Sequence, residues 1–260
     1  MPSIDPELQP LFSQSHADIR FEWGPAGAEL LATSCDVLVV VDIFSFTTAV
    51  DVAVSRGAVV YPTARRGRNA EELAQSVDGW LAVDRRNINP SDPYSLWPRS
   101  LMEIPNGTRL VLPSPNGSAI ASMAASESCQ VIAGCFRNRT AVAKAATKLG
   151  NNVGVIAAGE RWPDDRLRPA LEDFLGAGAI IHALIAEGRK PSHEARASSV
   201  AFEDARPELE QRLKETASSR ELIALGFHDD AALASELDVS ASVPCLKDGA
   251  FQNLGVERTA

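Results

Sequence analysis

The stretch DVLVVVDIFSFTTAV, residues 36 to 50, decides the fold class. It passes through five consecutive apolar residues, Val37–Val41, to a carboxylate, Asp42, and then through a hydroxyl-rich turn into an apolar helical pattern. A short continuous apolar run is typical of a parallel strand that is covered on both faces. The stretch therefore predicts a buried strand, a polar turn and a helix in immediate succession.

The same alternation continues along the chain. Further valine-rich runs predict strands over 58–61, 79–83, 108–112, 130–134 and 152–157. Helical patterns occupy 47–56, 69–76, 118–125, 140–149 and 170–187, with Asn69 as an expected N-cap. A longer helical segment from residue 193 contains a break near Pro207, and residues 242–255 resemble a final strand and hairpin.

Alternating strands and helices predict a three-layer α/β/α fold with a mainly parallel sheet. No repeat or flexible linker interrupts the pattern, so residues 1–260 are expected to form a single α/β domain. Gly176 and Gly178 lower the helix propensity of their segment, which suggests close packing against the sheet.

Composition excludes several classes of function. The net charge is -9 and the pI is about 5.0, so nucleic acid is not an expected partner. No apolar run approaches the roughly 20 residues that span a bilayer, and the first residues lack a basic-then-apolar leader pattern. We therefore expect a cytoplasmic protein without membrane contact. The four cysteines form no CxxC pair, which favours buried thiols over zinc ligands or disulfides.

Polar residues follow the predicted strands, and in open α/β sheets ligands bind beyond the carboxyl ends of strands. Asp42 is suited to a hard cation such as Mg²⁺, although it could equally cap the next helix. Thr47 and Thr48 start a helix and could bind an anion or serve as plain caps. Arg85 and Arg86 follow another predicted strand.

Two further strand ends combine turn residues with donors, and one is acidic. In SPNGSA, Asn116 and Gly117 indicate either a tight turn before a helix or a ligand loop. In FRNRTA, Arg137 and Arg139 flank Asn138, and arginine binds phosphate or sulfonate oxygens through two parallel hydrogen bonds. The acids of the remaining strand end are Glu160, Asp164, Asp165, Glu172 and Asp173.

Together, VVVDIFSFTTAVDVAVSRGA, LPSPNGSAIA, GCFRNRTAVA and AAGERW…LEDFLGAGAII resemble the 2-phosphosulfolactate phosphatase (ComB) family over about residues 20 to 250. The resemblance implies a Mg²⁺-dependent phosphatase that converts 2-phosphosulfolactate to sulfolactate and phosphate in coenzyme M biosynthesis. Family motifs match at Asp42, Thr47, Thr48, Asn116-Gly117, Asn138 and Glu172-Asp173. Ser45 and Phe46 stand where the family pattern has Arg-Ala, which removes a cation from the expected anion site.

The resulting hypothesis is metal-assisted hydrolysis of a small acidic phosphomonoester. Asp42, Glu172 and Asp173 are the expected catalytic and metal-binding residues, and the expected substrate-binding residues are Thr47, Thr48, Asn116, Gly117, Arg137, Asn138 and Arg139. Two alternatives remain: a non-catalytic protein that binds small anions, favoured by Ser45, and an α/β protein with a structural role only. A phosphatase for a different ester and a homodimer are also left open by the sequence.

Overall fold

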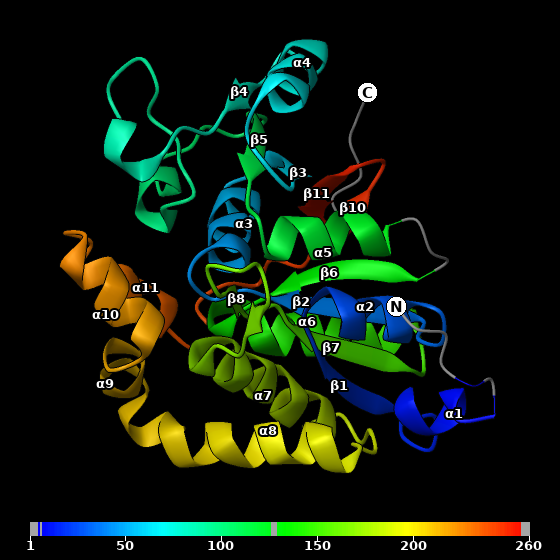
Figure 1. The fold of residues 1–260 in the computed structure, drawn as a ribbon. Coiled ribbons are helices and arrows are strands. Elements are labelled where there is room, and N and C mark those ends of the chain that lie inside the picture. Colours follow the sequence, from blue (N-terminus) through cyan, green and yellow to red (C-terminus); the bar gives the residue numbers. More distant parts are fainter. Residues whose placement is uncertain (1–4, 6, 126–128, 256–260) are drawn as a thin grey trace.

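The computed structural model describes residues 5, 7–125 and 129–255, and its element order alternates strands with helices as the sequence predicts (Figure 1). The strands are β1 Ile19–Trp23, β2 Val37–Val41, β3 Val59–Thr63, β4 Trp80–Leu81, β5 Arg109–Pro113, β6 Gln130–Gly134, β7 Val153–Ala157, β8 Glu160–Arg161, β9 Leu167–Arg168, β10 Pro244–Lys247 and β11 Ala250–Asn253. The α-helices are α1 Gln9–Phe12, α2 Gly24–Ala32, α3 Phe46–Ser55, α4 Arg68–Ser76, α5 Gly117–Ala124, α6 Arg139–Leu149, α7 Leu171–Ala186, α8 His193–Ala205, α9 Leu209–Lys214, α10 Ala217–Ala224 and α11 Asp230–Ala234.

The central sheet has nine strands in the order β1-β7-β2-β6-β10-β11-β3-β5-β4. Pairing is parallel within β1-β7-β2-β6 and within β3-β5-β4. The hairpin β10-β11 is antiparallel to both neighbours and joins the two parallel groups through the middle of the sheet. The sheet is therefore mainly parallel, and the predicted C-terminal hairpin is confirmed.

Alternate residues of β2 face two different cores, which produces the three layers. Val37, Val39 and Val41 pack with residues of α6, α7 and α8 on one face. Leu38 and Val40 pack with residues of α2, α3 and α5 on the other face. All five β2 residues are fully buried, so the continuous apolar run reflects a strand with helices on both faces.

Helix details follow the sequence except at Asn69 and Gly178. The break predicted near Pro207 is a 3₁₀ turn, Arg206–Glu208, between α8 and α9. The N-cap of α4 is Gly67, so Asn69 lies inside the helix and the capping prediction is wrong. A Cβ on Gly176 would come within 2.9 Å of Val41, whereas one on Gly178 would meet the Ser198 carbonyl on α8, so only Gly176 packs against the sheet.

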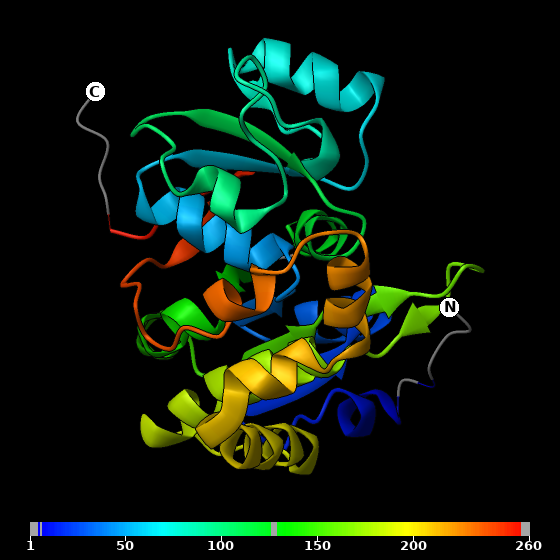
Figure 2. The ribbon, with the colours of Figure 1, turned by 90° about the vertical axis from the view of Figure 1, so that its left-hand side faces the viewer.

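The C-terminal helices α9, α10 and α11 lie between α8 and the loop region after β4, as both orientations show (Figures 1 and 2). That loop region contains the 3₁₀ turns Arg85–Asn87 and Pro98–Leu101, and the second of these contacts α11. The four cysteines are buried free thiols, as predicted. Among the described residues, no helix has the length and apolar composition needed to cross a bilayer.

Candidate functional site

The strands β2, β6 and β7 end at the same level, which sets the position of the site. Val41 at the end of β2 pairs with Gly134 of β6 and with Ala157 of β7. The residues that follow these three strands are therefore neighbours at one edge of the sheet. Asp42 is the first residue after the central strand of the three, and only 4% of it is exposed.

Backbone N–H groups from two helices hold the Asp42 carboxylate. Its Oδ2 accepts from the backbone N of Gly117 over 2.8 Å, and its Oδ1 accepts from the backbone N of Phe46 over 3.3 Å. Gly117 reaches this position because α5 returns across β2 from the other parallel group. These contacts, with a further hydrogen bond from the Ser114 side chain, fix the orientation of Asp42.

Thr47 and Thr48 serve the turn between β2 and α3. The Thr47 hydroxyl donates to the Asp42 carbonyl over 2.9 Å, and the Thr48 hydroxyl donates to the Ile43 carbonyl over 2.9 Å. The Thr47 backbone N–H also donates to the Asp42 carbonyl. Both threonines are fully buried, so the structure uses their hydroxyls to shape the loop that carries Asp42.

Glu172 and Asp173 lie in the first turn of α7 and are almost fully buried. Asp173 accepts from the backbone N of Ile43 over 2.7 Å and from the backbone N of Gly159 over 2.8 Å. Asp173 thus ties the ends of β2 and β7 to α7. Glu172 Oε1 is buried and has no hydrogen-bond partner within the described residues, and a buried oxygen of this kind is a candidate ligand atom.

Glu160, on the short hairpin β8-β9, completes an acidic cluster with Asp42, Glu172 and Asp173. Its Oε2 accepts from Asn116 Nδ2 over 2.9 Å, and Asn116 Oδ1 accepts from Arg161 Nε over 3.3 Å. Glu160, Arg161 and Asn116 line a cavity of about 200 Å³ together with Pro25, Ala26, Ala158, Asp165 and Leu167. Asn116, which the sequence predicted as a substrate-binding residue, therefore lines the same cavity as Glu160 and donates a hydrogen bond to it.

Burial and mutual repulsion shift the pKa values of Asp42, Glu160 and Asp173 upward. Burial, more than repulsion from Glu172, raises the pKa of Asp42 to about 6, although the Gly117 and Phe46 N–H groups oppose the shift. Burial, with repulsion from Asp42 and Glu172, raises the pKa of Glu160 to about 8. The pKa of Asp173 is raised for the same reasons. A cluster of this kind needs protons or a cation, and perturbed carboxyl groups gather at functional sites.

Arg137, Asn138 and Arg139 lie at the end of β6 but do not join this cluster. Arg137 pairs with Asp51 of α3 and with Glu236, and Arg139 pairs with Asp238. The Asn138 amide bonds the backbone of Cys135 and Ala133. All three side chains are therefore engaged in contacts that support the β6–α6 turn and the C-terminal segment.

The chemistry of the acidic cluster fits Mg²⁺, which prefers hard oxygen ligands. In the part of the chain that the structure describes, however, no three acidic, histidine or cysteine side chains converge as a ligand group. Mg²⁺ commonly uses one or two carboxylates and completes its shell with water and substrate phosphate. The unpartnered Glu172 Oε1 and the neighbouring Asp42 could supply these one or two carboxylates.

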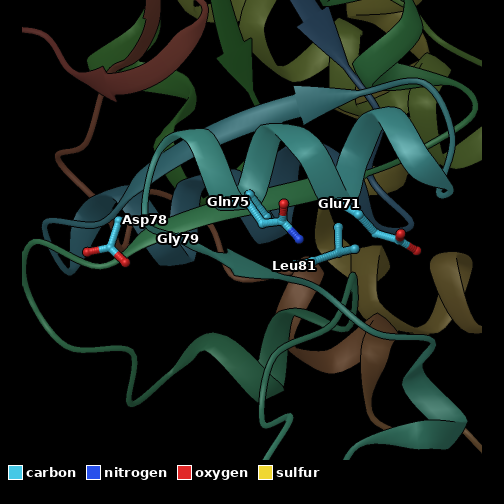
Figure 3. Close-up of a pocket in the computed structure, with 6 residues that line it drawn as sticks. Glu71, Gln75, Asp78, Gly79 and Leu81 are labelled. Atoms are coloured by element: carbon cyan, nitrogen blue, oxygen red, sulfur yellow. The ribbon is translucent and has the colours of Figure 1, made fainter.

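A second hollow lies far along the sheet, between α4 and β4 (Figure 3). Glu71, Gln75 and Asp78 border it, and Leu81 forms part of its wall. None of the strand-end acids lines this hollow. The acidic cluster at the ends of β2 and β7 is therefore the better candidate site.

Glu160 is the member of the cluster that the sequence patterns do not single out. A signal exists, because Glu160 follows β7 after only two residues, Ala158 and Gly159. It is one of five acids in the loop and first turn after that strand, and spacing alone does not distinguish buried from exposed carboxylates. Asp164 and Asp165 prove to be exposed and pair with Arg166 and Arg161.

The fold and the acidic cluster define a class, the three-layer α/β proteins that bind ligands at the carboxyl ends of their strands. Comparison with known proteins specifies the family: residues 28–249 match the 2-phosphosulpholactate phosphatase family model. The chain is 30% identical over 216 residues to the 2-phosphosulfolactate phosphatase of Methanothermobacter thermautotrophicus, covering 82% of this chain and 88% of that one. It is 30% identical over 222 residues to a probable 2-phosphosulfolactate phosphatase of Thermotoga maritima, covering 84% and 92%. The chain belongs to the 2-phosphosulfolactate phosphatase family.

Proposed function

We propose that this protein is a Mg²⁺-dependent phosphomonoesterase that hydrolyses 2-phosphosulfolactate to sulfolactate and phosphate. The observation that carries the proposal is the cluster of the buried acids Asp42, Glu172 and Asp173 with the half-buried Glu160 at the ends of β2 and β7. Family membership supplies the substrate. A role in coenzyme M biosynthesis, implied by the same resemblance, and a cytoplasmic location, expected from the composition, belong to the proposal.

The carboxylates have different roles in the proposed reaction. Asp42 and Glu172 would hold the metal, and bound Mg²⁺ would neutralise the phosphoryl oxygens. Asp173 holds the loop after β2 and the loop after β7 in fixed positions through its two backbone contacts. Gly117 and Phe46 orient Asp42 in the same way.

Glu160 is suited to protonate the leaving group. In the metal-free protein, burial and repulsion from Asp42 and Glu172 raise its pKa to about 8, which favours the protonated form, and the side chain borders the cavity. Attack on phosphorus breaks the bond between phosphorus and the C2 oxygen, and this oxygen takes the proton from Glu160 as it leaves. The attacking oxygen comes from water or, in a two-step reaction, from Asp42.

Phosphate release from a panel of small phosphomonoesters, with Mg²⁺ and with EDTA, tests the proposal. We expect release that requires Mg²⁺, is fastest with 2-phosphosulfolactate and is lost in Asp42→Ala. Asp36→Ala is the matched control, because Asp36 stands at the other end of β2, is exposed and accepts from the backbone N–H groups of residues 151 and 152. No release from any ester by a folded protein that binds sulfolactate would instead support a non-catalytic binding protein.

The identity of the nucleophile has its own test. If Asp42 attacks phosphorus, the wild-type protein forms an acyl phosphate that hydroxylamine cleaves during turnover, and Asp42→Asn forms none. Accumulation of phosphoenzyme in Asp42→Asn would assign the nucleophile to another residue. Direct attack by water produces no phosphoenzyme in either protein.

A further inference from the structure

Arg85, in the 3₁₀ turn after β4, is held in place on three sides. Its Nη2 donates to the Ser45 hydroxyl over 2.8 Å, and its Nη1 donates to Asp230 Oδ2 over 2.7 Å. The guanidinium carbon lies 4.6 Å from the centre of the Phe227 ring. Only 14% of the side chain is exposed, so the guanidinium has a defined orientation.

These contacts place the Arg85 guanidinium against the loop between β2 and α3, which carries Asp42. Ser45 is the residue before α3, and the next backbone N–H, that of Phe46, donates to Asp42 Oδ1. The residue that Arg85 contacts, Ser45, therefore directly precedes the residue whose N–H orients Asp42. The arginine comes from the other parallel group of the sheet, 40 residues along the sequence.

The other arginines predicted for anion binding are engaged elsewhere. Arg137 and Arg139 pair with carboxylates of α3 and of the segment after α11. Arg85 contacts one carboxylate, Asp230, and one neutral hydroxyl, Ser45. Arg139 also pairs with one carboxylate, but its partner Asp238 lies in the segment after α11, whereas Ser45 belongs to the loop that carries Asp42. A phosphoryl group that approaches four carboxylates needs a nearby cation, and Arg85 is positioned to supply one.

We propose that Arg85 binds the phosphoryl group of the substrate, with Ser45, Asp230 and Phe227 fixing its guanidinium. The proposal rests on the proposed phosphatase function and adds to it the residue that contacts the transferred group. Ser45 then has a defined role, because its small side chain leaves room for an arginine that reaches in from another element. The Ser45 hydroxyl also accepts a hydrogen bond from that arginine.

Binding of inorganic phosphate, measured by calorimetry with Mg²⁺ present, is the first readout, and kcat/KM for the best ester is the second. We expect Arg85→Ala to weaken phosphate binding and to lower kcat/KM at least about 10-fold each. Arg85→Lys recovers only part of the loss, because an ammonium group does not form two parallel hydrogen bonds. Added guanidinium ions restore part of the activity of Arg85→Ala, an effect that a purely structural role would not produce.

Arg86→Ala is the matched control, because it removes the same charge from the adjacent residue, whose side chain is 70% exposed and pairs with Asp84. We expect unchanged phosphate affinity and kcat/KM in this variant. Asp230→Asn removes the ion pair while Arg85 remains. If the two residues form only a structural clamp, Asp230→Asn and Arg85→Ala lower stability equally and neither changes phosphate binding, which would overturn the proposal.

The outcomes separate this proposal from the proposed function. Turnover in the wild-type protein with phosphate affinity unchanged in Arg85→Ala overturns the role of Arg85 and leaves the phosphatase intact. Phosphate binding that is lost in Arg85→Ala, without turnover of any ester by the wild-type protein, supports the anion site and refutes the phosphatase. A wild-type protein that binds no phosphate overturns the role of Arg85.

Discussion

The backbone N–H of Gly117 donates to Oδ2 of Asp42 over 2.8 Å, joining the start of α5 to the end of β2. A Cβ at position 117 would lie 2.7 Å from Asp42 Oδ2 and 2.4 Å from a ring carbon of Phe46. Gly117→Ala is therefore expected to displace Asp42, to lower kcat/KM at least about 10-fold and to reduce stability by about 1–3 kcal/mol. Phosphate release and urea unfolding measure the two effects.

The control for this substitution is Gly67→Ala at the start of α4. Gly67 has a φ of +123°, but a Cβ there meets no atom within 4 Å. This variant strains the backbone without contacting the acidic cluster, so its activity per folded molecule should equal that of wild type. An active Gly117→Ala protein would show that the position of Asp42 tolerates displacement.

The acidic cluster should also make stability depend on pH when divalent cations are absent. The raised pKa values of about 6 for Asp42 and about 8 for Glu160 exceed their unfolded values. Protonation of these groups stabilises the folded state fully at a pH below their pKa values in the unfolded chain. This stabilisation is lost as the pH rises through their higher pKa values in the folded protein. In EDTA, we expect the Tm to fall by about 5 °C between pH 5 and pH 8.5.

Mg²⁺ should oppose this loss, because a cation bound to the ionised cluster stabilises the folded state. The stabilisation by Mg²⁺ is expected to be larger at pH 8 than at pH 5. Combining Asp42→Asn with Glu160→Gln should flatten the pH dependence measured in EDTA. A Tm that rises from pH 5 to pH 8.5 without cations would contradict the assignment of raised pKa values.

Much of the fold could be predicted from local patterns. Most of the continuous apolar runs, such as Val153–Ala157, form strands because they pack between helices on both faces. The run predicted over 79–83 differs, because it forms only the two-residue strand Trp80–Leu81, in which Trp80 is exposed. The edge strand β1 could not be predicted in this way, because in Ile19–Trp23 charged residues alternate with apolar ones and the run is not continuous. The position of the C-terminal hairpin between β6 and β3 depends on pairing over more than 100 residues, which no local pattern encodes.

The acidic residues of the site could be predicted from the sequence, but the partners of its arginines could not. A strand that ends on Asp42 and a helix that begins with Glu172-Asp173 suggest an acidic site, and the structure brings these three residues together. The partners of Arg137 could not be predicted, because Asp51 faces it from α3 and Glu236 from the segment after α11. The contact between Arg85 and Ser45 likewise depends on how β4 and α3 lie in space.

Glu160→Gln tests the role of this residue as the proton donor. We expect kcat for an alkyl phosphate to fall about 100-fold, and the decline in rate at alkaline pH to disappear, because glutamine does not titrate. Hydrolysis of p-nitrophenyl phosphate should be affected much less, since its leaving group needs no proton. Glu103→Gln, at a side chain that is 93% exposed, is the control. An equal loss with both esters would assign Glu160 a role in binding instead.

A substitution of Arg137 distinguishes its predicted role in substrate binding from a structural role. Its Nε donates to Asp51 Oδ2 over 3.1 Å, and Asp51, fully buried, has a pKa raised by burial and lowered by Ser240 and Arg137. Arg137→Met leaves this carboxylate without its cation, so we expect urea unfolding to show a loss of about 3–5 kcal/mol. Asp51→Asn in the same chain should restore part of that loss.

Because Arg137 lies outside the acidic cluster, kcat/KM per folded molecule should stay within about twofold of wild type. A tenfold higher KM in Arg137→Met, with stability unchanged, would instead show that Arg137 binds the substrate.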